Sequence, residues 1–169
     1  MILELRILGD PVLRQVARDV EAVTPNVRAL LDDMVETMHA VGGVGLAAPQ
    51  VGISLRLIVL GWNKKQWRMI NPEISAATGE QASFEACLSI PGAEGEVRRA
   101  AKVTVRYVDE RGRQRRLTST GLLSRVLQHE IDHLYGVLFV DRLGAERVMT
   151  APSDLRSLRE SPHEERAAS

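Results

Sequence analysis

The stretch Gln128-His129-Glu130-Ile131-Asp132-His133 carries the spacing H-E-x-x-H, and the fold of the chain is expected to be built around it. Apolar residues recur on both sides of it at steps of three and four, which predicts a helix with one buried face. That face comprises Leu122, Leu123, Val126, Leu127, Ile131 and Leu134. Because positions four apart lie one above the other on a helix, His129 and His133 can direct two imidazoles at one point.

Glu130 follows the first of these histidines directly, close enough to reach a water molecule held between the two rings. Two imidazoles and an adjacent carboxylate are the groups that hold a divalent metal and move a proton from water. The alternative is a surface helix that carries two histidines by chance. Since the whole chain has only four histidines and two fall here, the metal site is the favoured interpretation.

A third ligand must come from elsewhere in the chain. In metzincin proteases a histidine follows six residues after the second one, but Phe139 occupies that position here. A downstream glutamate, as in thermolysin-like sites, is not favoured, because Glu146 is too near and Glu164 and Glu165 lie in a polar tail. The remaining candidate is Cys87, the single cysteine, for which the alternative is a buried inert thiol. Beside the H-E-x-x-H helix, a Cys/His/His site with an open fourth position is preferred.

Three stretches, in this order and spacing, resemble the peptide deformylase family: Gly43-Val44-Gly45-Leu46-Ala47-Ala48-Pro49-Gln50, Glu85-Ala86-Cys87-Leu88-Ser89 and the H-E-x-x-H segment. The resemblance extends from about residue 3 to 143. It implies an α+β fold, with small antiparallel or mixed β-sheets packed around a central H-E-x-x-H helix. It also implies a metal-dependent hydrolase that removes the formyl group from N-formylmethionine at the start of new polypeptides.

The resemblance further implies a role for each matched residue. Cys87, His129 and His133 would hold one divalent ion, usually Fe²⁺, with Zn²⁺, Ni²⁺ or Co²⁺ able to replace it. Glu130 would transfer protons, while the Gln50 side-chain amide and the Leu88 backbone N–H would stabilise the oxyanion. The residues expected to contact the N-formylmethionyl peptide are Val44, Gly45, Ala86, Leu122, Val126 and His129.

Two positions depart from the family pattern. Ala86 stands where a glycine usually precedes the cysteine, and Glu94 stands where several relatives carry arginine. A methyl group at Ala86 could crowd the substrate or restrict the backbone that directs Cys87. Two alternatives therefore stay open: an amidase with altered substrate range, or a metal-binding homologue with impaired catalysis. Retention of Glu130 argues against the second, because a structural metal site needs no proton carrier.

Because 44% of the 169 residues are hydrophobic, one domain with a proper core is expected. The resemblance implies that this is a single catalytic domain over residues 1–148. Equal numbers of basic and acidic residues, 22 each, provide no overall field for nucleic acid or membranes. The start of the chain does not resemble a signal peptide, and a reduced cysteine ligand suits the cytoplasm. Residues 149–169 are expected to be a polar tail, partly helical or disordered. Related tails sometimes dock on the ribosome, so a transient ribosome contact is a further open alternative.

Periodicity and turn residues predict the other elements. Helices are expected from Pro11 to about Ala17 and from Pro25 to about Val41, with Met34 and Met38 in the core and His39 in solvent. A hairpin turn is expected at residues 109–112, and strands at residues 55–60, 67–71, 81–84, 103–108 and 114–117. Residues 137–139 are expected to form a final buried strand or extended segment. Most of the arginines between residues 98 and 116 should face outward. The resemblance suggests that Arg99 instead pairs with Asp132.

Overall fold

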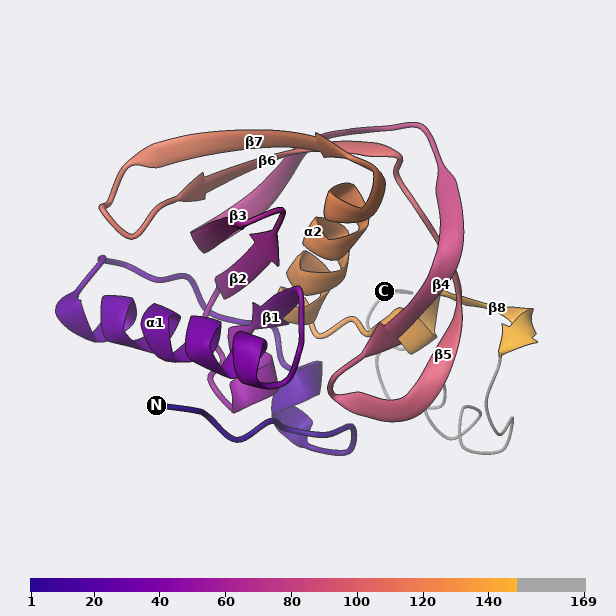
Figure 1. Ribbon diagram of the computed structural model, residues 1–169, viewed down its shortest axis with the longest axis horizontal. Coiled ribbons are helices and arrows are strands. Elements are labelled where there is room, and N and C mark those ends of the chain that lie inside the picture. Colours follow the sequence, from indigo (N-terminus) through magenta and orange to yellow (C-terminus); the bar gives the residue numbers. More distant parts are fainter. Residues whose placement is uncertain (149–169) are drawn as a thin grey trace.

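The structure of the protein is a computed structural model that describes residues 1–148. The chain forms two antiparallel sheets around one central helix (Figure 1). The larger sheet has the strand order β1-β2-β3-β6-β7, and the smaller one has the order β4-β5-β8. The strands of the larger sheet are β1 (Gly45–Ala47), β2 (Leu57–Trp62), β3 (Lys65–Thr78), β6 (Lys102–Val108) and β7 (Gln114–Thr120). Those of the smaller sheet are β4 (Gln81–Cys87), β5 (Ile90–Arg99) and β8 (Leu143–Val148).

Helix α2 (Gly121–Leu134) carries the H-E-x-x-H stretch and lies between the large sheet and the β4–β5 hairpin. Gly121, at φ 61°, allows the chain to turn sharply from β7 into the helix. Of the predicted apolar face, Leu127, Ile131 and Leu134 are buried in a core with residues of β2, β3 and β6, and Leu123 and Val126 pack partly buried against it. Leu122, at the start of the helix, is exposed. Burial of this face fixes the rotation of the helix, so the histidines must face the smaller sheet.

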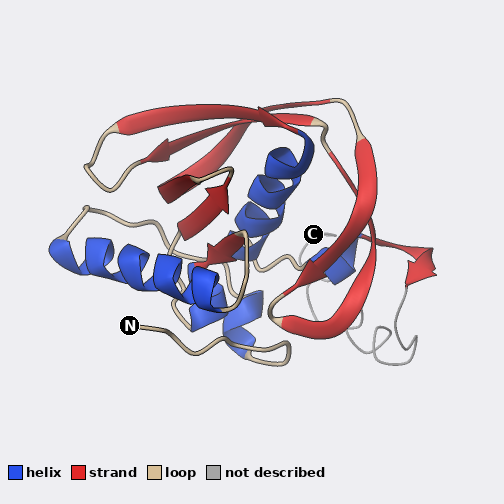
Figure 2. Ribbon diagram, viewed as in Figure 1, coloured by secondary structure: helices blue, strands red, loops and turns tan. Residues whose placement is uncertain are grey.

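Helix α1 (Pro25–Ala40) covers the β1–β2 end of the large sheet (Figure 2). The Thr24 hydroxyl accepts a hydrogen bond from the Val27 N–H, as expected for a residue that caps a helix. Met34 and Met38 are fully buried in a second core, which confirms their predicted place. His39 is exposed, also as predicted.

Several elements differ from the prediction, and neither β1 nor β8 was expected as a strand. The first helix is only a 3-10 turn, Pro11–Arg14, and β5 was not predicted because Pro91, Gly92 and Gly95 are typical of loops. Pairing along β4 nevertheless holds β5 extended over ten residues. Residues 137–139 do not form a strand: Leu138 is extended, as the alternative prediction had it, but Phe139 begins a 3-10 helix, Phe139–Arg142. The start of this helix is stabilised where Asp141 accepts a hydrogen bond from the Leu138 N–H.

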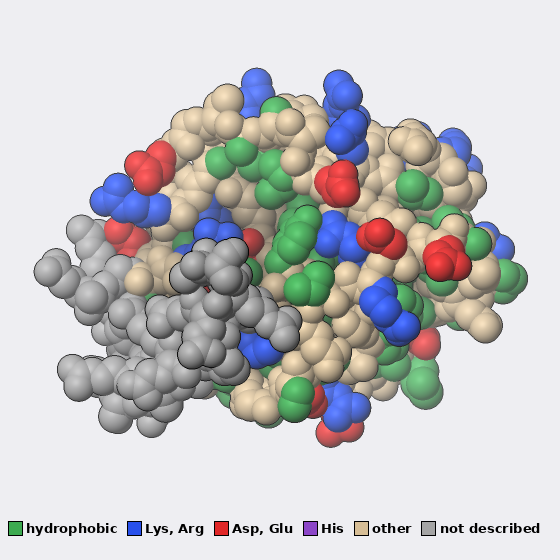
Figure 3. Space-filling view, turned by 180° about the vertical axis from the view of Figure 1, so that it is seen from behind, with side chains coloured by type: hydrophobic (Ala, Val, Ile, Leu, Met, Phe, Trp, Pro, Cys, Tyr) green, Lys and Arg blue, Asp and Glu red, His purple; other side chains and the backbone are tan. Residues whose placement is uncertain are grey.

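Most basic residues of β5 to β7 point into solvent, as the sequence predicts. Among the basic residues of β5 to β7, Arg98, Lys102, Arg106 and Arg116 are exposed whereas Arg99 is buried. Figure 3 shows basic and acidic side chains interspersed on the face opposite to that of Figure 1. Within residues 1–148, no helix has both the length and the apolar character needed to cross a membrane. The predicted tail at residues 149–169 lies outside the described residues.

Candidate metal centre

Cys87 lies at the end of β4, where an irregularity in the pairing with β5 brings its side chain toward α2. Its Sγ is 3.5 Å from His133 Nε2. The ligand atoms of Cys87, His129 and His133 all lie within 4.8 Å of one another, and the three side chains are mostly buried. The fold thus brings together the three residues that the sequence predicts as ligands.

This group fits a divalent metal ion. Bonds of about 2.0–2.3 Å to nitrogen and sulfur place ligand atoms roughly 3–4 Å apart in a tetrahedral site, similar to the separations found here. Burial lowers the pKa of His133 well below its ordinary value, so its ring is neutral and can bind a cation. Cysteine and histidine are also the ligand types that iron(II) and zinc share.

His129 is oriented by Glu85, whose Oε1 accepts a hydrogen bond from His129 Nδ1 at 2.9 Å. This bond leaves Nε2 as the ring nitrogen available for a cation. Burial alone would raise the pKa of Glu85, but hydrogen bonds from His129 and Arg99 outweigh it and lower the pKa to about 2. Burial likewise opposes charge on His129, while its bonds to Cys87 and Glu85 raise its pKa to about 10. A proton therefore competes with a cation for Nε2.

Glu130 is 5% exposed, and its Oε2 has no hydrogen-bond partner among the described residues. Burial raises the pKa of this carboxyl group to about 7. A divalent cation beside it would favour the charged form and so act against that shift. A buried oxygen without a protein partner, next to three ligand atoms, is well placed to accept a proton from water.

Gln50 approaches the same point from the 3-10 turn Ala48–Val51. Its Oε1 accepts a hydrogen bond from the Ala47 N–H at 2.9 Å, which fixes the orientation of the amide. Its Nε2 therefore faces the site, where it donates to Cys87 Sγ at 3.6 Å and to Ser89 Oγ at 3.3 Å. This geometry presents N–H bonds to a developing negative charge.

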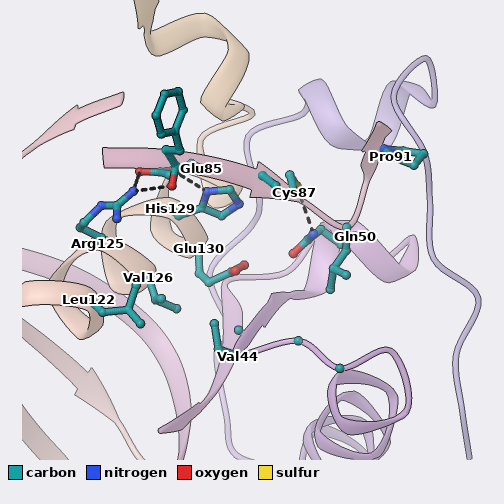
Figure 4. Close-up of a pocket in the computed structure, with 16 residues that line it drawn as sticks. Val44, Gln50, Glu85, Cys87, Pro91, Leu122, Arg125, Val126, His129 and Glu130 are labelled. Carbon is teal, nitrogen blue, oxygen red and sulfur yellow. Dashed lines mark hydrogen bonds and ion pairs between the residues drawn. The ribbon is translucent and has the colours of Figure 1, made fainter. Parts of the chain in front are cut away.

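A cavity of about 480 Å³ opens beside these groups (Figure 4). It lies between β1 and β4, and each of these strands is at the edge of its sheet. Predicted site residues that line it are Val44, Gly45, Gln50, Ala86, Cys87, Leu88, Leu122, Val126, His129 and Glu130. His133 is buried behind the cavity as part of the ligand group.

Comparison with known proteins agrees with this geometry. The polypeptide deformylase family model matches residues 2–148. The chain belongs to the polypeptide deformylase family. It is 48% identical to a peptide deformylase from Carboxydothermus hydrogenoformans, over 80% of this chain and 89% of that one.

Solved deformylases share the fold as well. A peptide deformylase from Legionella pneumophila superimposes with a TM-score of 0.85 at 41% identity and covers 100% of this chain and 99% of its own. One from Synechococcus elongatus, in complex with actinonin, gives 0.83 at 44% identity, over 92% of this chain and 83% of its own. These matches confirm the α+β fold and the family, whereas the roles of individual residues stay predictions.

Ala86, the departure from the deformylase pattern, lies within β4, and its φ is not positive. Alanine adopts such an extended conformation without strain. Glu94 lies opposite Ala86 in the β4–β5 pairing and is exposed. Neither residue therefore distorts the backbone that carries Cys87.

Four residues that line the cavity received no site role from the sequence: Phe84, Glu85, Pro91 and Arg125. The available signal for Arg125 was its position four residues before His129 on the same helix. For Glu85 there was none, because its contact with His129 spans 44 positions in the sequence.

Proposed function

We infer that this protein is a peptide deformylase, which hydrolyses the formyl amide at the N-terminal methionine of new polypeptides. The observation that carries this conclusion is the convergence of Cys87, His129 and His133 on one point beside Glu130, at the wall of a cavity. Family membership names the substrate, and the arrangement of side chains supplies groups suited to amide hydrolysis.

We propose that the three ligands hold one divalent ion, Fe²⁺ in the native protein, which Zn²⁺, Ni²⁺ or Co²⁺ can replace. When bound, such an ion polarises a carbonyl group and lowers the pKa of water. The thiolate of Cys87 makes the site sensitive to oxidation, so the reduced protein is the active form.

Glu130 then acts as the proton carrier. Its unpaired Oε2 takes a proton from the attacking water and returns it to the amine that leaves. Gln50 Nε2 and the Leu88 N–H stabilise the negative charge that develops on the carbonyl oxygen. Loss of one such donor typically costs about 2.7–4 kcal/mol of transition-state stabilisation.

The cavity between β1 and β4 receives the start of the peptide. We propose that the methionine side chain contacts Val44, Leu122, Val126 and the His129 ring, while the peptide backbone lies along Gly45 and Ala86 as an added strand. Such substrates are made during translation, so we place the activity in the cytoplasm. A ribosome contact by residues 149–169 stays a prediction.

The test is formate release from formyl-Met-Ala-Ser by protein purified without oxygen and loaded with Fe²⁺. Glu130→Ala should reduce kcat by at least about a hundredfold, the lower range for loss of an acid–base group, and should retain bound metal. Glu21→Ala, which removes an exposed carboxylate, is the matched control and should leave kcat unchanged. Absence of formate release by the wild type with one metal bound would refute the proposed function.

A further inference from the structure

Arg125 is a charged residue on the cavity-facing side of α2. Leu122, Val126 and His129 line the cavity from the same side, at the three- and four-residue steps that place them on one helix face. Figure 4 shows Arg125 with Leu122 and Val126 on the side of the cavity away from Cys87 and Gln50. A substrate side chain that extends away from the reacting amide therefore approaches Arg125.

The guanidinium group of Arg125 is mostly buried but incompletely bonded. Its side chain is 9% exposed, and its Nη2 donates to the Phe84 carbonyl and to Glu85 Oε2, both at 3.2 Å. Nε is buried and has no acceptor among the described residues. Nη1 has no acceptor among them either, but it is not buried, so it is the N–H group that a ligand in the cavity can reach. Since a donor without an acceptor is unfavourable once a ligand covers it, Arg125 has unused hydrogen-bonding capacity beside the cavity.

The contact with Glu85 does not explain why residue 125 is an arginine. Arg99 already binds both oxygens of Glu85, with distances of 2.6 and 2.9 Å, and its side chain is 2% exposed. The contact from Arg125 is longer and reaches one oxygen only. An apolar side chain at this position would continue the apolar lining formed by Leu122 and Val126. Neither the packing of the cavity wall nor the neutralisation of Glu85 therefore requires an arginine at position 125.

We propose that Arg125 is a specificity-determining residue that allows the enzyme to deformylate peptides whose first residue is methionine sulfoxide. This inference rests on the proposed deformylase function. The thioether of methionine is only a weak acceptor, whereas oxidation turns it into a polar group with an oxygen. A guanidinium N–H donates to that oxygen, while Leu122 and Val126 contact the methylene groups that both forms share.

The test compares kcat/KM for formyl-Met-Ala-Ser, its methionine sulfoxide analogue and its norleucine analogue. The wild type should hydrolyse the sulfoxide peptide within about tenfold of the methionine peptide. Arg125→Leu should lower kcat/KM for the sulfoxide peptide by about tenfold to a hundredfold more than for norleucine, as expected for one hydrogen bond from a charged donor. A purely structural role would lower all three values together and would overturn the proposal.

Arg98→Leu is the matched control, because Arg98 is an arginine on β5 whose side chain is 67% exposed and does not line the cavity. It should leave the ratio between the three peptides unchanged. Thermal unfolding of both variants separates folding defects from changes in selectivity. Without activity on formyl-Met-Ala-Ser, the proposed function fails, and the binding experiment below then decides this inference.

Binding of the deformylated products does not depend on catalysis. Calorimetry with Met(O)-Ala-Ser and norleucine-Ala-Ser should give comparable affinities for the wild type, and a selective loss of the sulfoxide peptide for Arg125→Leu. Should that variant fail to fold, the wild-type comparison is sufficient. A wild type that binds the norleucine peptide more than about a hundredfold better has no accessible donor for the sulfoxide oxygen, which would refute the proposal.

Discussion

His129 Nδ1 and Glu85 Oε1 lie 2.9 Å apart, so a ligand on α2 is held in place by a carboxylate on β4. Partners of this kind fix the ring and the tautomer of a metal ligand. Glu85→Ala should therefore weaken metal binding by about 10- to 100-fold, measured by competition with a chelator. Glu85→Gln, which keeps an acceptor oxygen, should fall between the alanine variant and the wild type.

Glu80→Gln is the control for this prediction, since Glu80 is an exposed carboxylate near the start of β4 that pairs only weakly with Arg98 at 3.5 Å. It should leave the affinity for the metal unchanged. Equal affinities of the wild type and Glu85→Ala would show that the ring of His129 is held by packing alone.

Among the glycines that line the cavity, Gly45 has the least room for a Cβ atom. A Cβ atom there would lie 2.8 Å from Glu130 Oε1 and 2.9 Å from Val126 Cγ1. Gly45→Ala should therefore displace the Glu130 side chain and lower kcat/KM by roughly 10- to 100-fold. Gly61→Ala is a suitable control, because its Cβ would meet the flexible end of Met38 at 3.1 Å, away from the cavity. If both variants retain full activity, Glu130 has more freedom than its burial suggests.

Alanine at position 86, in place of the usual glycine, should lower kcat/KM only slightly. It lies in extended backbone, so Ala86→Gly relieves no strain and should change kcat/KM by less than about threefold, since it removes no contact specific to the transition state. Ala82→Gly changes an exposed alanine on the same face of β4, outside the cavity, and reports the effect of glycine on the strand itself. A tenfold gain for Ala86→Gly alone would mean that the methyl group obstructs the peptide.

Local patterns explain why the ligand helix could be predicted and the environment of its ligands could not. His129, Glu130 and His133 are fixed by helical periodicity, which needs no knowledge of the rest of the chain. Cys87 was found because a single cysteine beside such a helix has few other roles, and because the family resemblance pointed to it. The role of Glu85 depends on how β4 is placed against α2, a tertiary contact that periodicity does not encode.

The errors in secondary structure have a similar origin. Pro91, Gly92 and Gly95 interrupt the local strand pattern of β5, yet pairing with β4 overrides this preference. Residues 137–139 are apolar enough for a strand, but the bond from the Leu138 N–H to Asp141 selects a 3-10 turn. In both places hydrogen bonds that the sequence does not display decide the conformation.

The pairing of Arg99 with Asp132 is confirmed, with Nη1 and Oδ2 2.9 Å apart, but Arg99 also binds Glu85. Arg99→Leu should therefore lower the free energy of unfolding by about 3 kcal/mol, the lower end for breaking a buried ion pair, because it removes the buried cation between Glu85 and Asp132. Glu85 would keep its contacts with Arg125 and His129, and Asp132 would keep Arg142. Arg98→Leu, at the exposed neighbouring position, should cost no more than about 1 kcal/mol. Both values come from denaturant unfolding of the metal-free proteins.

Exchange of the two charges should not restore stability, since Arg99→Asp combined with Asp132→Arg still leaves Glu85 opposite an acidic residue. Full recovery in the double variant would show that Asp132, and not Glu85, is the principal partner of Arg99.

Asp109 gives the fold a pH dependence that is remote from the metal ligands. Burial opposes its charge, but hydrogen bonds from the Arg113 and Arg111 N–H groups and from the Arg113 side chain outweigh it and lower the pKa below 3.8. A carboxylate with a lowered folded-state pKa stabilises the protein above pH 3.8, and this contribution is lost as the pH falls through the lowered value. Asp109→Asn should therefore be less stable than the wild type near neutral pH, with a difference that shrinks below about pH 4. Unfolding curves across this range, with Glu110→Gln as the control from the same turn, measure the difference, and a constant gap at all pH values would contradict the assignment.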